Sequence, residues 1–500
     1  MSQLKSLAKD TVIYGISNIL NRLLNFVIAT FYLTNLFNNE QTEYGIYTIM
    51  YAYMALLLVL LTYGMETAFF RFGAKASDRE RIFSTGFVSL LVSTAVVVTG
   101  FIFFSDEIAG VLSRKGDGVY VILFSLIIGF DVLSVLPFAR LRLEQRPVRF
   151  AFYKFLNVVI FGATLLFFLE LCPYLARHGI AWADIVYNPN HKLRYVFWAN
   201  LISSIVTFLM VLPMLMRSKL HFEWVLWKKM IHYALPLVAV GVTGIIVLLA
   251  GQYLIPWWLP GTEEEKTIQV GIWGASVKIA TLLNLFTQVF KYAVEPFFFK
   301  HSEKGGKRSM YGIVTRLYTI AASLGFLTIL LYIDVFQYLV GSNFRSGLKV
   351  APVLLLAFVF FGVYFNFSIW YKLTDKTRIG ALISTAGMFV SLIANYWLIP
   401  HLGIMGAAWA SLISYVFLSL LAYVVGQRYY PIPFHPERLL VYIGLAMGTF
   451  YLSQQLDTTF SFSLIPKLIV HSFLIILYLG LVALFEKNGL VRELRKGIHR

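Results

Sequence analysis

The sequence predicts an all-α polytopic membrane protein with about 14 transmembrane helices. Of its 500 residues, 59% are hydrophobic and only 13% are charged. No soluble fold could bury that much apolar surface and keep a polar exterior. The bilayer core admits only helices or closed barrels. The apolar runs are too long and too continuous for the strands of a barrel, so helices are predicted.

Fourteen stretches are each long and apolar enough to cross a hydrocarbon core of ~30 Å. They are residues 11–33, 46–70, 82–104, 118–139, 150–170, 193–216, 231–254, 268–295, 312–332, 350–370, 380–399, 404–425, 438–455 and 466–485. The first stretch is expected to be an uncleaved anchor, because no small-residue cleavage site follows a short apolar core. The single Cys172 cannot form an internal disulfide.

Lysines and arginines predict that both termini lie in the cytoplasm. Of 42 such residues, 28 fall in the eight segments on the side of the N-terminus, and 9 fall on the other side. The net charge of +17 therefore reflects topology, and no nucleic-acid partner is expected. The short loops contain neither a G-x-x-x-x-G-K-S/T phosphate-binding loop nor a Cys/His metal cluster. Neither ATP hydrolysis nor a metal cofactor is expected.

An internal repeat is indicated by three weak matches at offsets of 226 to 230 residues. The matching pairs are Tyr44–Tyr47 with Val270–Trp273, Glu66–Arg71 with Glu295–Lys300, and Arg142–Arg146 with Lys372–Lys376. The offset spans six helices, so both copies would cross the membrane in the same sense. The sequence thus predicts a six-helix lobe at 1–217, a second at 218–430, and two further helices with a basic cytoplasmic tail at 431–500. The two lobes would form a parallel repeat, related by a pseudo-two-fold axis along the membrane normal, with Glu66 equivalent to Glu295.

Polar side chains in two predicted spans are candidates for lining a substrate cavity. Four in the first span follow the spacing i, i+3, i+4, i+7 and share one helical face, namely Asn18, Asn21, Arg22 and Asn25. The eighth span carries a second polar face with Thr281, Asn284, Gln288, Lys291 and Glu295, and Lys278 lies near mid-depth but rotated away from it. Such groups in hydrocarbon are costly, so each is a functional hypothesis. The alternative for Arg22 is a packing network with a buried carboxylate.

Three carboxylates are candidates for coupling or gating. Glu66 and Glu295 lie near the predicted cytoplasmic ends of the second and eighth spans, which the repeat makes equivalent. The alternative role for both is an ion pair at the membrane interface. Asp131 lies deep in its span, where a carboxylic acid could carry a proton between conformational states. The alternative role of Asp131 is a structural ion pair with Arg22 or Lys154. Arg316, near the start of its span, is expected to extend to the cytoplasmic surface.

A motif at Asn395–Ala410 joins two of the predicted spans. It reads as an Asn, an apolar run, Leu-Ile-Pro, a short turn containing Gly403, and a Gly-Ala-Ala helix start. Pro400 is expected to end a helix, and Gly403 to permit the tight turn. The small residues from Gly406 onward favour close approach of a neighbouring helix. Asn395 could contact substrate or bond across helices.

This motif, with Val270–Trp273 and Leu339–Phe344, resembles the multidrug/oligosaccharidyl-lipid/polysaccharide (MOP) exporter superfamily, in its polysaccharide transporter or O-antigen flippase branch. The resemblance implies a non-enzymatic flippase that moves a polyprenyl-diphosphate-linked oligosaccharide, the repeat unit of a surface polysaccharide such as lipopolysaccharide O-antigen, by alternating access. It implies a place in the bacterial inner membrane, with membrane lipid, a polysaccharide polymerase and glycosyltransferases as partners. No cofactor is expected beyond a coupling H⁺ or Na⁺.

Three alternatives to this function stay open. A multidrug/cation antiporter or a flippase of the peptidoglycan precursor lipid II would have the same fold. A membrane-bound polymerase or ligase would need a substantial outer loop with catalytic groups, which the sequence lacks. Cations at mid-depth, Arg22 and Lys278, argue against an antiporter for cationic drugs and would suit a diphosphate.

Overall fold

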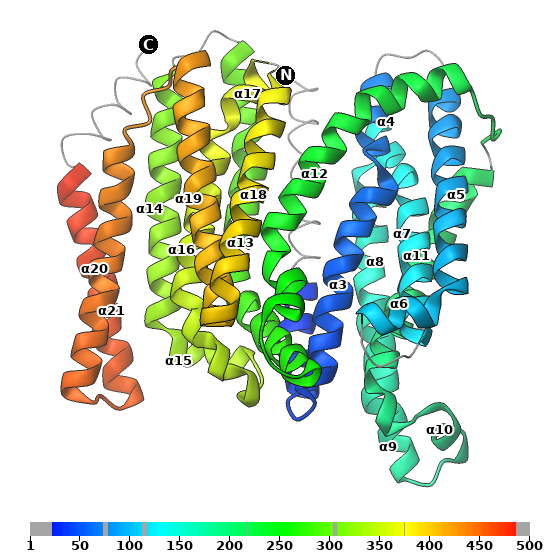
Figure 1. Ribbon diagram of the computed structural model, residues 1–500, viewed down its shortest axis with the longest axis horizontal. Coiled ribbons are helices and arrows are strands. Elements are labelled where there is room, and N and C mark those ends of the chain that lie inside the picture. Colours follow the sequence, from blue (N-terminus) through cyan, green and yellow to red (C-terminus); the bar gives the residue numbers. More distant parts are fainter. Residues whose placement is uncertain are drawn as a thin grey trace. The chain divides into compact units, whose positions relative to one another are not determined.

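The computed structural model describes residues 23–73, 79–112, 118–216, 218–303, 308–374 and 376–486. Within these residues the chain is helical and forms no strand (Figure 1). Thirteen segments of the described part are long and apolar enough to cross a membrane, and they coincide with all predicted spans but the first. The end of the first span forms a shorter apolar helix at Leu23–Leu36. The protein is thus an all-α polytopic membrane protein, as predicted.

The chain divides into two compact units. The first unit contains Met1–Tyr32, Glu40–Tyr253 and Gly261–Gly271, and the second contains Leu33–Asn39, Leu254–Pro260 and Ile272–Arg500. Helices α12 (Trp224–Trp258) and α13 (Glu263–Glu303) each contribute residues to both units.

The first unit is a bundle around α7, whose core-facing side chains are almost all apolar. Its helices are α3 (Gln41–Thr62), α4 (Met65–Gly73), α5 (Arg79–Phe103), α6 (Ser105–Leu112), α7 (Gly118–Leu143), α8 (Pro147–Leu166), α11 (Lys192–Met216) and most of α12. Helix α7 packs against α5 and α11, and α11 packs against α8 (Figure 1). The short α9 (Cys172–Arg177) and α10 (Ala181–Val186) lie beyond the ends of α8 and α11.

The second unit repeats the packing order of the first. Its helices are most of α13, then α14 (Ser309–Leu331), α15 (Ile333–Phe336), α16 (Ala351–Phe367), α17 (Ile369–Leu373), α18 (Thr377–Leu402), α19 (Ile404–Tyr429), α20 (Pro436–Phe460) and α21 (Leu464–Glu486). Helix α16 packs against α14 and α19, and α19 packs against α18. If the two units are copies in a parallel repeat, corresponding helices must pack in the same order, as they do here. The lobe boundaries and the rotation between lobes stay predictions.

The second predicted span is interrupted, contrary to the continuous run expected over 46–70. Helix α3 ends at Thr62, and Tyr63 and Gly64 both adopt positive φ, of 30° and 69°, before α4 begins. The break directs the Tyr63 hydroxyl to Ser89 on α5, at 2.6 Å, and the same serine accepts a 2.6 Å hydrogen bond from Trp227 on α12. The apolar run hides the break, because the residues on both sides of it remain hydrophobic.

Helices α20 and α21 pack on α14 of the second unit. Their inner ends cover Arg316 of α14, which is only 2% exposed and lies 3.9 Å from Glu486 of α21. Arg438 approaches the same carboxylate at 3.8 Å, and the Tyr442 hydroxyl also donates a hydrogen bond to it. The expectation that Arg316 extends to the membrane surface is therefore wrong. Two later helices bury it and supply its counter-charge.

Candidate functional site

The polar face predicted on the first span lies largely outside the described residues. Asn18, Asn21 and Arg22 precede residue 23, where the description begins. Asn25 is described, belongs to the first unit, and exposes its side chain. The role of this face as a cavity lining stays a prediction.

Helix α13 carries the second predicted polar face, and its described members lie in the second unit. The Gln288 amide donates a long hydrogen bond of 3.5 Å to the Asn284 side chain, one turn earlier. The Lys291 ammonium lies 5.0 Å from the centre of the Phe365 ring on α16, and Lys372 approaches that ring at 5.5 Å. The helix continues through Glu295, but the side chain of that residue lies outside the description.

Lys278 lies midway along the membrane-spanning part of α13, which runs from Glu263 to Lys291. At 100° per residue it points about 80–140° away from Asn284, Gln288 and Lys291. Its side chain is half-buried, and within the described part of the chain it forms no hydrogen bond or ion pair. A lone ammonium at mid-depth is costly unless water or an anion meets it. Lys278 is therefore the strongest candidate for contact with an anionic ligand in the second unit.

Asp131 sits in a polar network inside the first unit. On α7 it accepts a 2.8 Å hydrogen bond from Ser204 of α11. Among the described residues Lys154 of α8 forms no ion pair with this carboxylate, and its ammonium lies 4.2 Å from the centre of the Phe138 ring. A hydroxyl donor satisfies one carboxylate oxygen whether or not the other oxygen is protonated. The arrangement is compatible with proton exchange, and the coupling role stays a proposal.

A polar stripe on α11 extends this network, and the sequence interpretation missed it. Asn200 donates to the Tyr51 hydroxyl of α3 at 2.6 Å, and Thr207 accepts a 2.8 Å bond from Asn157 of α8. The stripe consists of Asn200, Ser203, Ser204 and Thr207, and the last three are buried. Its spacing i, i+3, i+4, i+7 is the one that marked the first span, so the same rule could have found it.

Glu66 forms an ion pair with Arg142 at the end of α7. The guanidinium of Arg142 also lies 4.9 Å from the Phe70 ring and 5.7 Å from the Phe150 ring. Both side chains of the pair are 36% exposed. The contact joins α4 to α7. It matches the ion-pair alternative for Glu66, and its partner is Arg142, 76 positions later, and not the nearby Arg71.

The Asn395–Ala410 motif forms the predicted turn at Gly403 and the predicted close helix contact, but the expectation that Pro400 ends the helix is wrong, because the helix continues to Leu402 and ends at Gly403. Gly403 has φ 59° and ψ −135°, which favours glycine, and Gly406 packs so closely that a Cβ there would lie 2.2 Å from the Leu398 carbonyl oxygen. Helix α18 runs two residues past Pro400, further than expected. Asn395 is fully buried and donates to the Ser391 carbonyl of its own helix at 2.7 Å.

The two segments that first indicated the repeat meet at a close helix crossing in the first unit. A Cβ on Gly45 of α3 would lie 2.0 Å from the carbonyl oxygen of Thr267 on α13. A Cβ on Gly271 would lie 2.8 Å from the Gln41 carbonyl oxygen. Both glycines are thus required by backbone contact at the predicted outer ends of α3 and α13.

Comparison with known proteins places these features in a family. The sequence profile of the polysaccharide biosynthesis protein family matches residues 7–302. No curated protein matches the chain.

Solved structures of transporters resemble the chain over most of its length. The lipid II flippase MurJ, in an inward closed conformation, has a TM-score of 0.70 at 16% identity, with 95% of this chain and 99% of that chain covered. An inward-facing multidrug resistance MATE family transporter of the MOP superfamily has a TM-score of 0.64 at 11% identity, with 82% and 94% covered. A mutant of the Vibrio cholerae MATE transporter VcmN has a TM-score of 0.59 at 13% identity, with 85% and 97% covered. The chain therefore belongs to the polysaccharide biosynthesis protein family and has the fold of the MOP superfamily of flippases and exporters, as its motifs predict.

Proposed function

We propose that the protein flips a polyprenyl-diphosphate-linked oligosaccharide, the repeat unit of a cell-surface polysaccharide, across the bacterial cytoplasmic membrane. The match to the polysaccharide biosynthesis protein family over residues 7–302 carries this proposal. An O-antigen unit of lipopolysaccharide is one substrate of this class. Glycosyltransferases would supply the substrate on the inner side, and a polymerase would use it on the outer side.

The chemistry of such a substrate explains why a protein is needed. A sugar head group that enters hydrocarbon loses its hydrogen bonds to water, at a cost of roughly several kcal/mol for each polar group left unpaired. A polar path between helices replaces those bonds while the polyprenyl tail remains in lipid. The amide and hydroxyl side chains on α13 and at the start of the chain are suited to sugar hydroxyls, and ammonium or guanidinium groups are suited to the diphosphate.

Lys278 is the described residue that best fits the diphosphate. Its ammonium lies midway along a membrane-spanning segment and has no described ion-pair partner. A cation at this place favours an anionic substrate over the cationic drugs of a multidrug antiporter. The resemblance to the structure of MurJ over 95% of this chain makes lipid II, which also carries a diphosphate, the second candidate substrate.

The driving force is proposed to be an H⁺ or Na⁺ gradient and not ATP hydrolysis by this chain. Asp131 is the proposed coupling group, because it is a carboxyl group inside a span and a hydroxyl group is its described hydrogen-bond donor. Alternating protonation would change the charge of the first unit as the transporter changes conformation.

A reconstitution assay tests the substrate and the role of Lys278 together. Purified protein in vesicles is given either an undecaprenyl-diphosphate-linked oligosaccharide or lipid II, and the outer-leaflet fraction is measured with time. We expect flipping of the first substrate, a loss of at least about tenfold in Lys278→Gln, and partial rescue in Lys278→Arg. Lys229→Gln removes an exposed charge from α12 and serves as the control.

Each outcome separates the candidates. Flipping of lipid II alone would replace the proposed substrate with the second candidate. Flipping of the oligosaccharide lipid at an unchanged rate in Lys278→Gln would remove that residue from the site. Transport of a cationic dye with no flipping of either lipid would overturn the proposal.

A further inference from the structure

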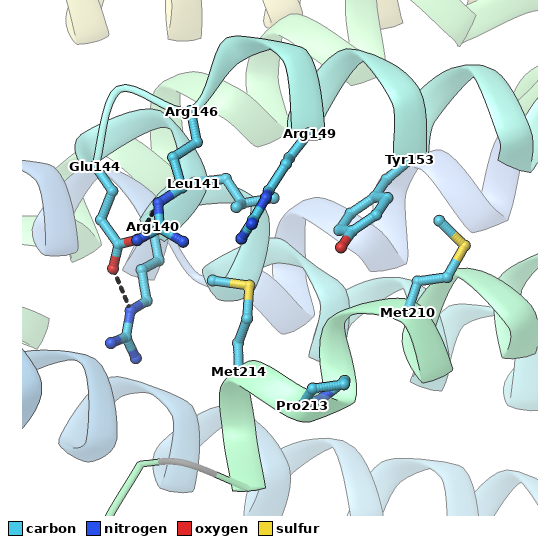
Figure 2. A pocket seen from close by; sticks show the side chains of 9 residues that line it. All are labelled: Arg140, Leu141, Glu144, Arg146, Arg149, Tyr153, Met210, Pro213 and Met214. Atoms are coloured by element: carbon cyan, nitrogen blue, oxygen red, sulfur yellow. Dashed lines mark hydrogen bonds and ion pairs between the residues drawn. The ribbon is translucent and has the colours of Figure 1, made fainter.

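A cavity of about 460 Å³ lies in the first unit where α7 ends, α8 begins and α11 ends (Figure 2). This is the side that the distribution of lysines and arginines predicts to be cytoplasmic. Three arginines and one glutamate line it, namely Arg140, Arg146, Arg149 and Glu144. None of these residues belongs to the proposed transport path, so the inference below does not rest on the proposed function.

Two of the three guanidinium groups are engaged with protein carboxylates. Arg140 donates to Glu144 at 2.7 Å and pairs with Glu80 at 3.0 Å. Arg146 lies 3.1 Å from the other oxygen of Glu144. The single charge of Glu144 is thus shared by two guanidinium groups, and the lining of the cavity has a net positive charge.

The third guanidinium is available to a ligand. Within the described residues, Arg149 forms no hydrogen bond and no ion pair, and the hydroxyl of Tyr153, one turn later on α8, forms no hydrogen bond. Figure 2 shows both side chains extending from α8 toward α11. A guanidinium fork and a phenol on the same helical face can bind two oxygens of one phosphate group.

The far wall of the cavity is apolar. Met210, Pro213 and Met214 of α11 line it opposite Arg149 and Tyr153 (Figure 2). Flexible methionine side chains adapt to irregular apolar ligands. A free inorganic anion would gain nothing from this wall, whereas a lipid would place its phosphate on the arginines and its glycerol or chain carbons on the methionines.

We propose that this cavity binds the phosphate group of a lipid in the cytoplasmic leaflet. Basic pockets between membrane helices on this side recognise anionic head groups through such contacts. Two sources share the chemistry, an anionic glycerophospholipid and a polyprenyl diphosphate. Either one would hold the α7–α8 turn against α11 by bridging Arg149 to the methionine wall.

Binding is measured on the purified full-length protein in detergent by native mass spectrometry. The separate ligands are phosphatidylglycerol, phosphatidylcholine, undecaprenyl diphosphate and inorganic phosphate. We expect at least one of the two anionic lipids to bind more tightly than phosphatidylcholine and inorganic phosphate. Arg149→Gln should weaken that binding by about tenfold, the loss of one charge-assisted contact. The tighter of the two anionic lipids identifies the source.

Arg378→Gln is the matched control, since Arg378 is an exposed arginine in the first turn of α18. Its binding of the anionic lipid should stay within about twofold of wild type. Tyr153→Phe provides a second variant with a smaller change in shape and should weaken binding measurably. Unchanged binding in both Arg149→Gln and Tyr153→Phe, equal weakening in Arg378→Gln, or equally tight binding of phosphatidylcholine or inorganic phosphate would overturn the proposal.

Discussion

Replacing Gly45 with alanine tests whether the crossing of α3 and α13 depends on glycine. The alanine Cβ would lie 2.0 Å from the Thr267 carbonyl oxygen and 2.8 Å from the Thr267 methyl carbon. Non-bonded heavy atoms are most stable at about 3.5 Å, so the helices would have to separate locally by roughly 1.5 Å. The clash is with backbone, so rotation of a side chain cannot relieve it fully.

The expected cost follows from this displacement. Overpacking a tight contact typically costs about 1–3 kcal/mol, and a backbone clash belongs at the upper end of that range. About 3 kcal/mol corresponds to roughly a hundredfold change in the folding equilibrium. Gly100→Ala in α5 is the control, because a Cβ there meets nothing within 4 Å. An alanine in an open helical position should be neutral or stabilise by about 0.5–1 kcal/mol.

Thermal unfolding of the two purified variants in the same detergent measures the difference. Gly45→Ala should unfold several degrees below wild type, and Gly100→Ala at or above it. The same purified variants in the flipping assay show whether activity falls together with stability. If Gly45→Ala is as stable and as active as Gly100→Ala, then the close crossing does not constrain the native state and the reasoning is refuted.

Three further substitutions test other parts of the structure. Asp131→Asn keeps the acceptor for Ser204, so abundance should stay near wild type while the dependence of export on external pH is lost; an unchanged rate and pH profile would discard Asp131 as the coupling group. Glu66→Gln removes an ion pair whose members are each 36% exposed, so the loss in unfolding free energy should not exceed about 1 kcal/mol, and a larger loss by thermal unfolding would contradict this. Gly403→Ala forces a side chain into φ 59°, ψ −135°, so it should destabilise by about 1–3 kcal/mol in the same measurement, and wild-type stability would show that the turn relaxes.

The membrane-spanning helices could be predicted from the sequence because their signal is local. A run of about 20 apolar residues marks a span whatever it packs against. The break at Tyr63 and Gly64 could not be predicted in the same way, since the apolar run continues across it. The break lies where α12 comes close, since a Cβ on Gly64 would lie 3.1 Å from the Ala234 carbonyl oxygen, and this contact with a distant part of the chain leaves no local signal.

The candidate site was only partly predictable, because partners come from distant parts of the chain. Asp131 could be identified as a carboxylate inside a span, but its partner Ser204 lies 73 positions later. An ion pair could be expected for Glu66, but its partner Arg142 lies 76 positions later in the chain. The burial of Arg316 could not be predicted, because nothing in its own helix shows that Glu486 of α21 would cover it.

The two units share a packing order, but their corresponding helices α7 and α16 differ in charge. In the first unit, Asp131 of α7 accepts a hydrogen bond from Ser204 of α11. In the second unit, α16 has no charged residue along Ala351–Phe367, and its contact with α18 includes a Tyr364 hydroxyl 3.2 Å from the hydroxyl of Ser384. Of these two helices at corresponding places in the packing order, only α7 carries a carboxylate. Asp131→Asn would make the interior of the first unit as uncharged at this position as that of the second, so any pH dependence that survives must arise elsewhere in the chain.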